Sequence, residues 1–317
     1  MSKADPKKLE EKKLEDLKKW AVKSGYPLEN QIEKFLKDVS WDGERKILRN
    51  YSFEAEDEQN NWKIRSIDFV ASFSIKTSTI RVPGWQTDPE EGLEVHVIVD
   101  SKSSTEGAFW FTPDSSNTKV ALASLVPVLL EDPFFKCPAK IHRKEFLEAS
   151  EGIRAWKVAV SGKKVGENDG RDLVYNSAIQ VTQGFMSILE PTMQLIGQPH
   201  GKGGHYYRKG HIYLILVVTD AELLMMKEGV TPEIVAQASS VEEFCEPVSK
   251  VLVQQPNLFH LRNSLASLSA STKHVTKGGF GWLDVNFEGT PVGFVGIAEL
   301  PNVLSSILDH IKTICQS

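Results

Sequence analysis

One short run of residues, apolar for most of its length and charged at its end, constrains the fold of this chain most. Residues Leu93 to Lys102 read L-E-V-H-V-I-V-D-S-K, and β-branched residues dominate the run. Such a run is typical of a strand that is covered on both faces. Side chains two positions apart on a strand point to the same side, so we expect Asp100 and Lys102 to lie together at its exposed end. The pair is either an ordinary strand-end ion pair, which is the commoner case, or part of a site that holds a metal ion and a water.

Strand-like and helix-like segments alternate along the rest of the chain, without an internal repeat or a long low-complexity linker. This alternation predicts an α/β fold, most economically one extended domain. The predicted strands lie near residues 47–53, 63–73, 93–102, 108–113, 155–160, 211–219, 250–253 and 292–297. The predicted helices lie near residues 6–23, 27–39, 120–130, 173–189, 220–226, 258–268 and 301–314, with Asp220 as an N-cap.

Two further carboxylates occupy positions that call for an explanation. Asp68 lies inside the apolar strand run I-D-F-V-A, where a buried and unpaired carboxylate costs several kcal/mol. It therefore needs a metal ion, hydrogen-bond donors or a proton, and Arg65 and Ser66 are near enough in sequence to be structural partners. Glu29 lies next to the apolar stripe of the helix that Pro27 begins, where a solvated glutamate and a functional one are equally expected.

Composition narrows the class of protein. The chain is 41% hydrophobic and 25% charged, as in soluble globular proteins, and we find no apolar run long enough to span a bilayer and no signal-peptide pattern. Three cysteines lie far apart without a C-x-x-C pair, which disfavours a disulfide framework or a structural zinc site and indicates a cytoplasmic protein. The net charge of −5 does not suggest a nucleic-acid binder, although local basic patches can coexist with an acidic metal site.

Four phrases, in order, resemble the PD-(D/E)XK nucleases, and most closely the restriction-endonuclease-like branch of restriction and phage-defence systems. Tyr26 to Glu29 (Y-P-L-E) begins the first core helix, Ser66 to Asp68 lies in a strand, and Asp100 to Lys102 ends the next strand. The run Tyr213 to Ala221, which ends in V-V-T-D-A, is similar to a later strand of that branch. The resemblance covers roughly Gly25 to Ala221. It implies a restriction-endonuclease-like core, a mixed central sheet flanked by helices, over residues 25–221. A lysine-rich helix (1–24) would precede this core, and an α/β C-terminal extension (222–317) would pack on it.

The resemblance also implies a metal-dependent endonuclease that hydrolyses phosphodiester bonds, in DNA rather than RNA, with Mg²⁺ as the ion and Mn²⁺ as a substitute. Asp68, Asp100 and the backbone carbonyl of Ser101 would be direct ligands, and Glu29 would bind a second ion or a water on the ion. Lys102 would orient the attacking water and stabilise charge on the phosphate. The ligand set suits Mg²⁺, which binds oxygen and keeps several waters.

The sequence departs from the family pattern at two positions. Asp100 stands where many members have glutamate, a change that the general motif allows. Ser66 stands where the branch often has glutamate, which weakens a contact to the ligand residues. Gln180 and Gln183 resemble helix glutamines that some members place near the scissile strand, but a surface amide is the commoner explanation for each.

An acidic nuclease needs basic residues near its cleft, and the sequence offers Lys202, Arg208 and Lys209, interleaved with tyrosines, as nucleic-acid contacts. The further basic candidates are Lys140, Arg143, Lys163 and Lys164. The segment 201–204 (G-K-G-G) lacks the full phosphate-loop pattern and is better explained as a connector. The histidines near it would need strand- or helix-fixed geometry to bind zinc.

Two functions therefore remain open. The first is a Mg²⁺-dependent nuclease whose activity is controlled by homo-oligomerisation or by a regulatory protein partner. The second is a catalytically inactive module on the same fold that binds nucleic acid or a partner. All four polar site positions are present, which favours the nuclease.

Overall fold

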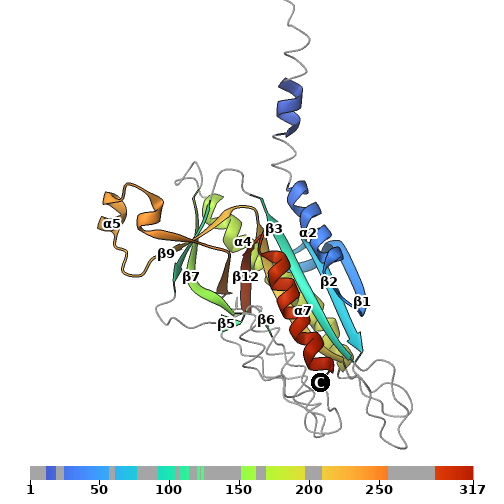
Figure 1. Cartoon of the computed structure of the whole chain (residues 1–317). Coiled ribbons are helices and arrows are strands. Elements are labelled where there is room, and N and C mark those ends of the chain that lie inside the picture. Colours follow the sequence, from blue (N-terminus) through green and yellow to red (C-terminus); the bar gives the residue numbers. More distant parts are fainter. Residues whose placement is uncertain are drawn as a thin grey trace, which may run out of the picture.

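The computed structural model of the chain describes residues 12–18, 25–56, 61–76, 92–103, 108–113, 120–121, 123–124, 151–161, 169–196, 209–255 and 290–316. Over these ranges the protein is a mixed α/β fold in which helices flank a mixed central sheet (Figure 1). The predicted helix at 258–268 and most of the predicted helix at 120–130 lie outside the described residues.

One twisted sheet forms the centre of the molecule. Across the sheet the strands are β1 (Glu44–Glu56), β2 (Trp62–Lys76), β3 (Gly92–Lys102), β8 (Lys209–Thr219), β12 (Thr290–Gly296), β11 (Lys250–Gln255), β7 (Glu151–Ser161), β4 (Ala108–Pro113), β9 (Glu222–Met226) and β10 (Cys245–Val248). Two short strands lie off this path: β5 (Val120–Ala121) pairs with β7, and β6 (Ala123–Ser124) pairs with β8.

Strand directions in the sheet are mixed. The strands β1, β2 and β3 are successively antiparallel, whereas β3, β8 and β12 run parallel to one another. The segment after residue 221 supplies β12 and β11, which lie between β8 and β7, so both halves of the chain build one continuous sheet. The centre is buried on both faces: Val95, Val97, Ile98 and Val99 of β3 are fully buried, as the run of β-branched residues predicts.

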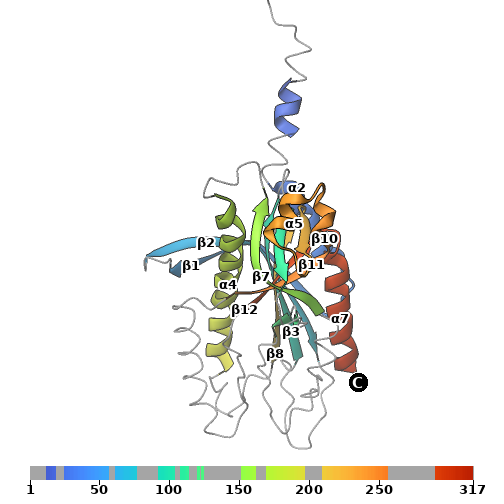
Figure 2. The same cartoon turned by 90° about the vertical axis from the view of Figure 1, so that its left-hand side faces the viewer.

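Helices cover both faces of the sheet. The helices are α2 (Tyr26–Asp38), α4 (Asp169–Ile196), α5 (Pro232–Gln237), the 3₁₀ turn η1 (Val241–Glu243) and α7 (Leu300–Gln316), and residues 12–18 are also helical. Figure 2 shows α4 on one side of the central strands and α7 on the other. The apolar side chains of α2 and α7 pack in one core cluster, and those of α4 pack in a second cluster on the opposite face.

Local sequence explains where α2 begins and which face it buries. Gly25 has φ 72°, a left-handed conformation that glycine adopts at little cost, and its carbonyl accepts from the N–H of Glu29. Pro27 suits the first turn because its missing N–H has no partner there in any case. Leu28, Ile32 and Leu36, spaced four apart, are buried on the sheet, which leaves the glutamates between them at the side.

The helix α4 lies very close to β2. A Cβ at Gly184 would be 2.8 Å from Cδ1 of Ile67 and 3.1 Å from its Cγ2. Glycine therefore allows the close approach at this point, and Ile67 directly precedes Asp68 in the chain.

Two of the predicted helices are wrong where the structure describes them. Residues 222–226 of the predicted helix at 220–226 form the strand β9, and Val120–Ala121 and Ala123–Ser124 form β5 and β6. Leucine, methionine and glutamate favour helices, but β9 pairs with both β4 and β10, and this pairing outweighs local propensity. Asp220 accepts from the Ser103 hydroxyl (2.8 Å) instead of capping a helix.

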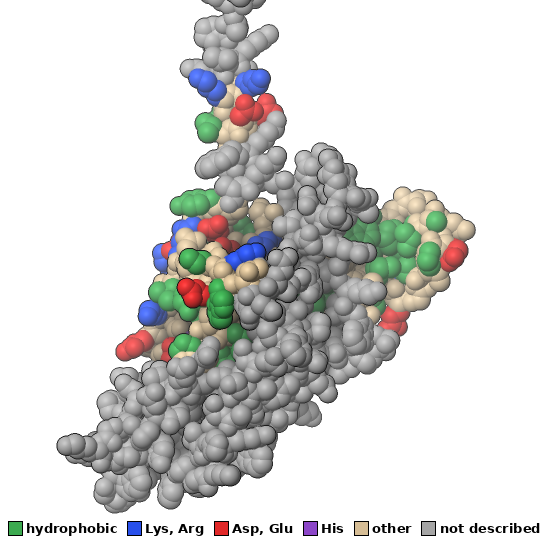
Figure 3. Space-filling model, turned by 180° about the vertical axis from the view of Figure 1, so that it is seen from behind, with side chains coloured by type: hydrophobic (Ala, Val, Ile, Leu, Met, Phe, Trp, Pro, Cys, Tyr) green, Lys and Arg blue, Asp and Glu red, His purple; other side chains and the backbone are tan. Residues whose placement is uncertain are grey.

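Apolar side chains reach the surface toward both ends of the sheet. Trp62 and Ile64 of β2 are exposed, as are Ile234 and Val235 of α5. Figure 3 shows apolar surface in both regions, mixed with charged side chains on the β1–β2 side. Within the described ranges, no helix is both long enough and apolar enough to cross a membrane.

Candidate functional site

Asp68 and Asp100 adjoin the last paired residues of β2 and β3. The antiparallel register of β2 and β3 runs from Lys76 and Gly92 to Phe69 and Val99. The pairing ends there, and the next residue on each strand is an aspartate, Asp68 on β2 and Asp100 on β3. The two carboxylates are near enough for Asp68 to affect the pKa of Asp100. The two aspartates of the sequence pattern therefore lie near each other at one end of the β2–β3 pair.

Ser101 fixes the Asp68 carboxylate. The backbone N–H and the hydroxyl of Ser101 both donate to Oδ2 of Asp68, each at 2.6 Å. These two hydrogen bonds hold the Asp68 carboxylate beside the end of β3. The predicted role of the Ser101 carbonyl as a metal ligand stays a prediction.

Lys102 contacts the buried carboxylate of Asp100. Its Nζ lies 2.9 Å from Oδ2 of Asp100, which confirms that the two side chains share one side of β3. Asp100 is only 1% exposed. Burial raises the pKa of Asp100 to about 6; Lys102 opposes this shift and the charge of Asp68 adds to it. A further positive charge at this point would stabilise the ionised form.

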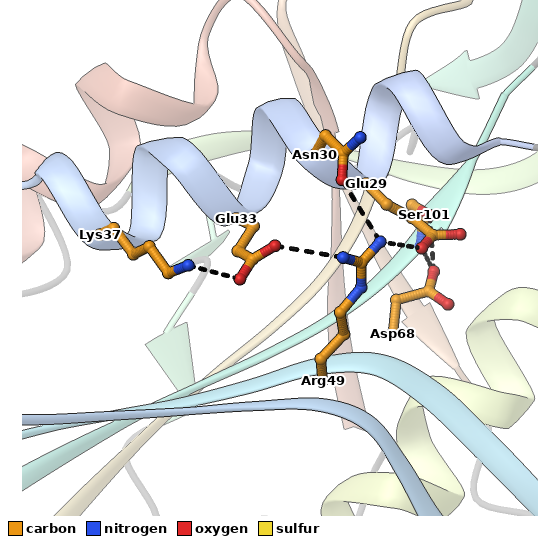
Figure 4. Close-up of polar contacts among 7 residues, drawn as sticks. All are labelled: Glu29, Asn30, Glu33, Lys37, Arg49, Asp68 and Ser101. Carbon is orange, nitrogen blue, oxygen red and sulfur yellow. Dashed lines mark hydrogen bonds and ion pairs between the residues drawn. The ribbon is translucent and has the colours of Figure 1, made fainter.

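Glu29 points from α2 toward the same region of β2 and is held by Arg49 of β1 (Figure 4). Nη2 of Arg49 lies 2.9 Å from Oε2 of Glu29, and Nη1 lies 3.2 Å from Oε2 of Glu33. The guanidinium also lies over the rings of Tyr26 and Phe69, and Phe69 is the residue after Asp68. Hydrogen bonding to Glu29 raises the pKa of Arg49, and a hydrogen bond from Lys37 lowers the pKa of Glu33.

Polar contacts hold the backbone around these carboxylates. The Thr219 hydroxyl donates to the carbonyl of Lys102 (2.6 Å), which ties the end of β3 to the end of β8. Gln180 of α4 donates to the carbonyl of Ser66, two residues before Asp68. Gln180 therefore supports the strand that carries Asp68, whereas Gln183 is buried in α4. Asn50 of β1 lies between the residues that pair with Ile67 and Phe69, the two neighbours of Asp68, and has φ 52°, an uncommon conformation that asparagine tolerates.

Of the three predicted nucleic-acid contacts, Lys202 and Arg208 lie outside the described residues. Lys209 is the first residue of β8 and pairs with Gly92, whereas Asp100 pairs with Val217. At about 3.3 Å per residue, the backbone of Lys209 is roughly 26 Å from that of Asp100 along the strands. The backbone of Lys209 therefore lies at the opposite end of these strands from the aspartates. The predicted role of this loop in nucleic-acid binding stays a prediction.

A second polar cluster, which sequence reasoning did not assemble, lies at that opposite end. Glu94 and His96 of β3 and His211 of β8 offer ligand atoms that all lie within 4.8 Å of one another. Among the described residues this is the only group of three histidine, cysteine, aspartate or glutamate side chains that meets this distance, so Glu29, Asp68 and Asp100 do not form so tight a set. The pattern E-x-H on a predicted strand was the sequence signal that could have indicated this cluster, because it places both side chains on one face of the strand.

Comparison with models of known protein families, with curated proteins and with solved structures finds no match to this chain. The geometry of the two polar clusters is therefore the basis on which a function can be inferred.

Proposed function

We propose that the protein is a Mg²⁺-dependent nuclease of the PD-(D/E)XK type, with a restriction-endonuclease-like core, which acts on DNA. The observation that carries the proposal is the arrangement of Asp68, Asp100 and Lys102 at the end of the β2–β3 pair. The Asp68 carboxylate lies near enough to Asp100 to raise its pKa, and the lysine two residues after Asp100 contacts it at 2.9 Å.

The donor set suits the proposed ion. Mg²⁺ prefers oxygen ligands and keeps several waters, so two carboxylates and one backbone carbonyl are sufficient to bind it. Asp68, Asp100 and the carbonyl of Ser101 supply these oxygens. Asp100 is a buried carboxylate with a second carboxylate beside it, and Lys102 is the only cation that the structure pairs with it among the described residues. A divalent cation would offset the remaining negative charge, which is the electrostatic reason to expect one here.

Each side chain then has a distinct task. When bound, the ion neutralises charge on the scissile phosphate and lowers the pKa of a water. Lys102, which contacts Asp100, would orient that water and donate to a phosphate oxygen. Ser101 locks Asp68 in one orientation through two hydrogen bonds, which is the preorganisation that a ligand needs. Glu29, which is held by Arg49, is suited to bind through a water or to help bind a second ion.

Plasmid cleavage tests this proposal. We expect the full-length chain to cleave DNA with Mg²⁺ or Mn²⁺ and to lose this activity in EDTA; a single-stranded RNA assayed in parallel tests the preference for DNA. Lys102→Ala should reduce cleavage by at least about 100-fold but retain most of the Mn²⁺ affinity, because the lysine acts on the water and is not a ligand. Asp100→Ala should lose both properties. Lys227→Ala, which removes an exposed lysine after β9 that contacts the carbonyl of Glu242, is the matched control and should retain activity.

Three outcomes would contradict parts of the proposal. Cleavage that survives EDTA and both site variants would place the chemistry elsewhere. Equal Mn²⁺ affinity in Asp100→Ala and the wild type would remove Asp100 from the ligand set, even if activity fell. Nucleic-acid binding without any cleavage would favour the catalytically inactive binding module.

A further inference from the structure

Glu94, His96 and His211 lie on two adjacent parallel strands at the end of β3 that is remote from Asp100. In the register of β3 and β8, Glu94 is directly across from His211, and His96 is across from Tyr213. The three ligand atoms converge within 4.8 Å. His96 and Asp100 are four residues apart on one strand, a separation of roughly 13 Å. This exceeds the spacing of about 3.5–4 Å at which two ions share one reaction centre, so the cluster is separate from the proposed nuclease site.

The two histidines are buried and fixed in place. His96 is 6% exposed and His211 is 4% exposed. Nε2 of His96 lies 2.9 Å from Nδ1 of His211, and the two rings are within 14° of parallel. The ring of His96 also stacks on Tyr213, with centroids 4.7 Å apart. A third strand contributes as well, because the Ser72 hydroxyl of β2 lies 3.1 Å from Nδ1 of His96.

We propose that Glu94, His96 and His211 form a binding site for a divalent transition-metal ion, with Zn²⁺ as the best fit. Zn²⁺ binds well to a set of two imidazole nitrogens and one carboxylate. Mg²⁺ suits this set poorly, because it prefers oxygen ligands throughout. The contact from Ser72 to the other nitrogen of His96 is the kind of outer contact that orients a ligating histidine. The two clusters on β3 would thus select different metals.

The geometry requires little movement to bind the ion. Zn–N bonds of about 2.0–2.1 Å in a tetrahedron hold two nitrogens roughly 3.4 Å apart. The nitrogens of His96 and His211 are 2.9 Å apart, so they would separate by about half an ångström and the rings would turn until both lone pairs point at the ion. The ion would take the place of the proton between the two nitrogens. Because the ligands come from β3 and β8, the bound ion would link the two central strands, whose other ends carry Lys102 and Thr219.

Metal titration of the chelator-treated, full-length chain tests this site, with Zn²⁺ and Co²⁺ as the probes. We expect one tightly bound equivalent of Zn²⁺ by calorimetry, and with Co²⁺ the intense visible absorption of a tetrahedral centre. Glu94→Gln should weaken Zn²⁺ binding by at least tenfold, and His211→Gln should abolish it. Glu94 is only partly buried, so Glu94→Gln keeps the test valid even where replacement of a buried histidine prevents folding.

Asp100→Asn is the matched control, because it removes a carboxylate from the other cluster on the same strand and should leave Zn²⁺ binding unchanged. The site is contradicted if the wild type shows no saturable Zn²⁺ binding, if Glu94→Gln binds Zn²⁺ as the wild type does, or if Asp100→Asn loses the ion. None of these results depends on nuclease activity, which is measured separately by plasmid cleavage with Mg²⁺.

Discussion

Lys102 lies 2.9 Å from the carboxylate of Asp100, and yet the pKa of Asp100 is raised and not lowered. A neighbouring ammonium group favours the ionised carboxylate, whereas burial disfavours it. Here burial is the larger influence, and Asp68 adds a second negative charge. Without a metal ion, the ionised form of Asp100 is therefore a cost to the folded state that its lysine only partly offsets.

Replacement of Asp100 by asparagine should stabilise the metal-free protein at high pH. The pKa rises from 3.8 to about 6 on folding, so the folded state holds a proton between about pH 4 and pH 6 that the unfolded state releases. Stability from this group is therefore present below pH 4 and is lost as the pH rises to 6, by at most about 3 kcal/mol. In chelator at pH 8 we expect Asp100→Asn to unfold at a higher urea concentration than the wild type, with little difference at pH 4.

The control for this prediction is Asp309→Asn on the exposed face of α7, which should show no such dependence on pH. A stability difference between Asp100→Asn and the wild type that is the same at pH 4 and pH 8 would contradict the assignment of the cost to the ionised carboxylate.

Metal affinity at the proposed nuclease site should depend on pH for the same reason. The ion binds the ionised carboxylate, so protons compete with it below the pKa of Asp100, about 6. We expect Mn²⁺ affinity to fall about tenfold for each pH unit below 6 and to level off above it. Calorimetry on Glu94→Gln measures this with metal binding at the other cluster weakened, and an affinity that is constant from pH 5 to pH 7 would contradict it.

The parts of the site that follow from short-range patterns could be predicted from the sequence. The positions of α2 and β3 follow from periodicity, and the contact between Asp100 and Lys102 follows from the two-residue repeat of a strand. The pairing of His96 with His211 could not be predicted, because the residues are 115 positions apart and meet only through the parallel register of β3 and β8.

The errors in the predicted secondary structure also have a non-local cause, the pairing of strands. The residues of β9 favour a helix locally, and only pairing with β4 and β10 makes them a strand. Likewise, nothing in the local sequence of Glu29 indicates that Arg49, twenty residues later on β1, holds it. Non-local pairing of this kind is the information that single-sequence reasoning lacks.

Gly184→Ala should destabilise the protein and reduce activity. Alanine favours a helix over glycine by about 1 kcal/mol, but the added Cβ would lie 2.8 Å from Cδ1 of Ile67. Overpacking of this kind costs about 1–3 kcal/mol, and relief of the clash would displace the residue before Asp68. Ile67→Val removes the clashing methyl group, so the double variant should recover part of the stability that Gly184→Ala loses. Additive losses in the double variant, measured by urea unfolding, would show that the clash is not the cause.

Glu29 and Glu33 offer a test of whether Glu29 has a catalytic role. Both glutamates lie on α2, and both pair with Arg49, at 2.9 Å and 3.2 Å respectively. Glu29→Gln removes one ion pair, whereas Glu33→Gln removes two, because Glu33 also pairs with Lys37 at 2.6 Å. An exposed or half-exposed pair contributes about 0–1 kcal/mol, so Glu33→Gln should be the less stable variant by at most about 1 kcal/mol. Only Glu29 stands where the resemblance to PD-(D/E)XK nucleases implies an acidic residue at the proposed nuclease site. We therefore expect Glu29→Gln to reduce plasmid cleavage by at least about tenfold and Glu33→Gln to retain it, measured at saturating Mg²⁺. Equal losses in the two variants would show that the glutamates act only by holding Arg49, and would leave Asp68, Asp100 and Lys102 as the reacting set.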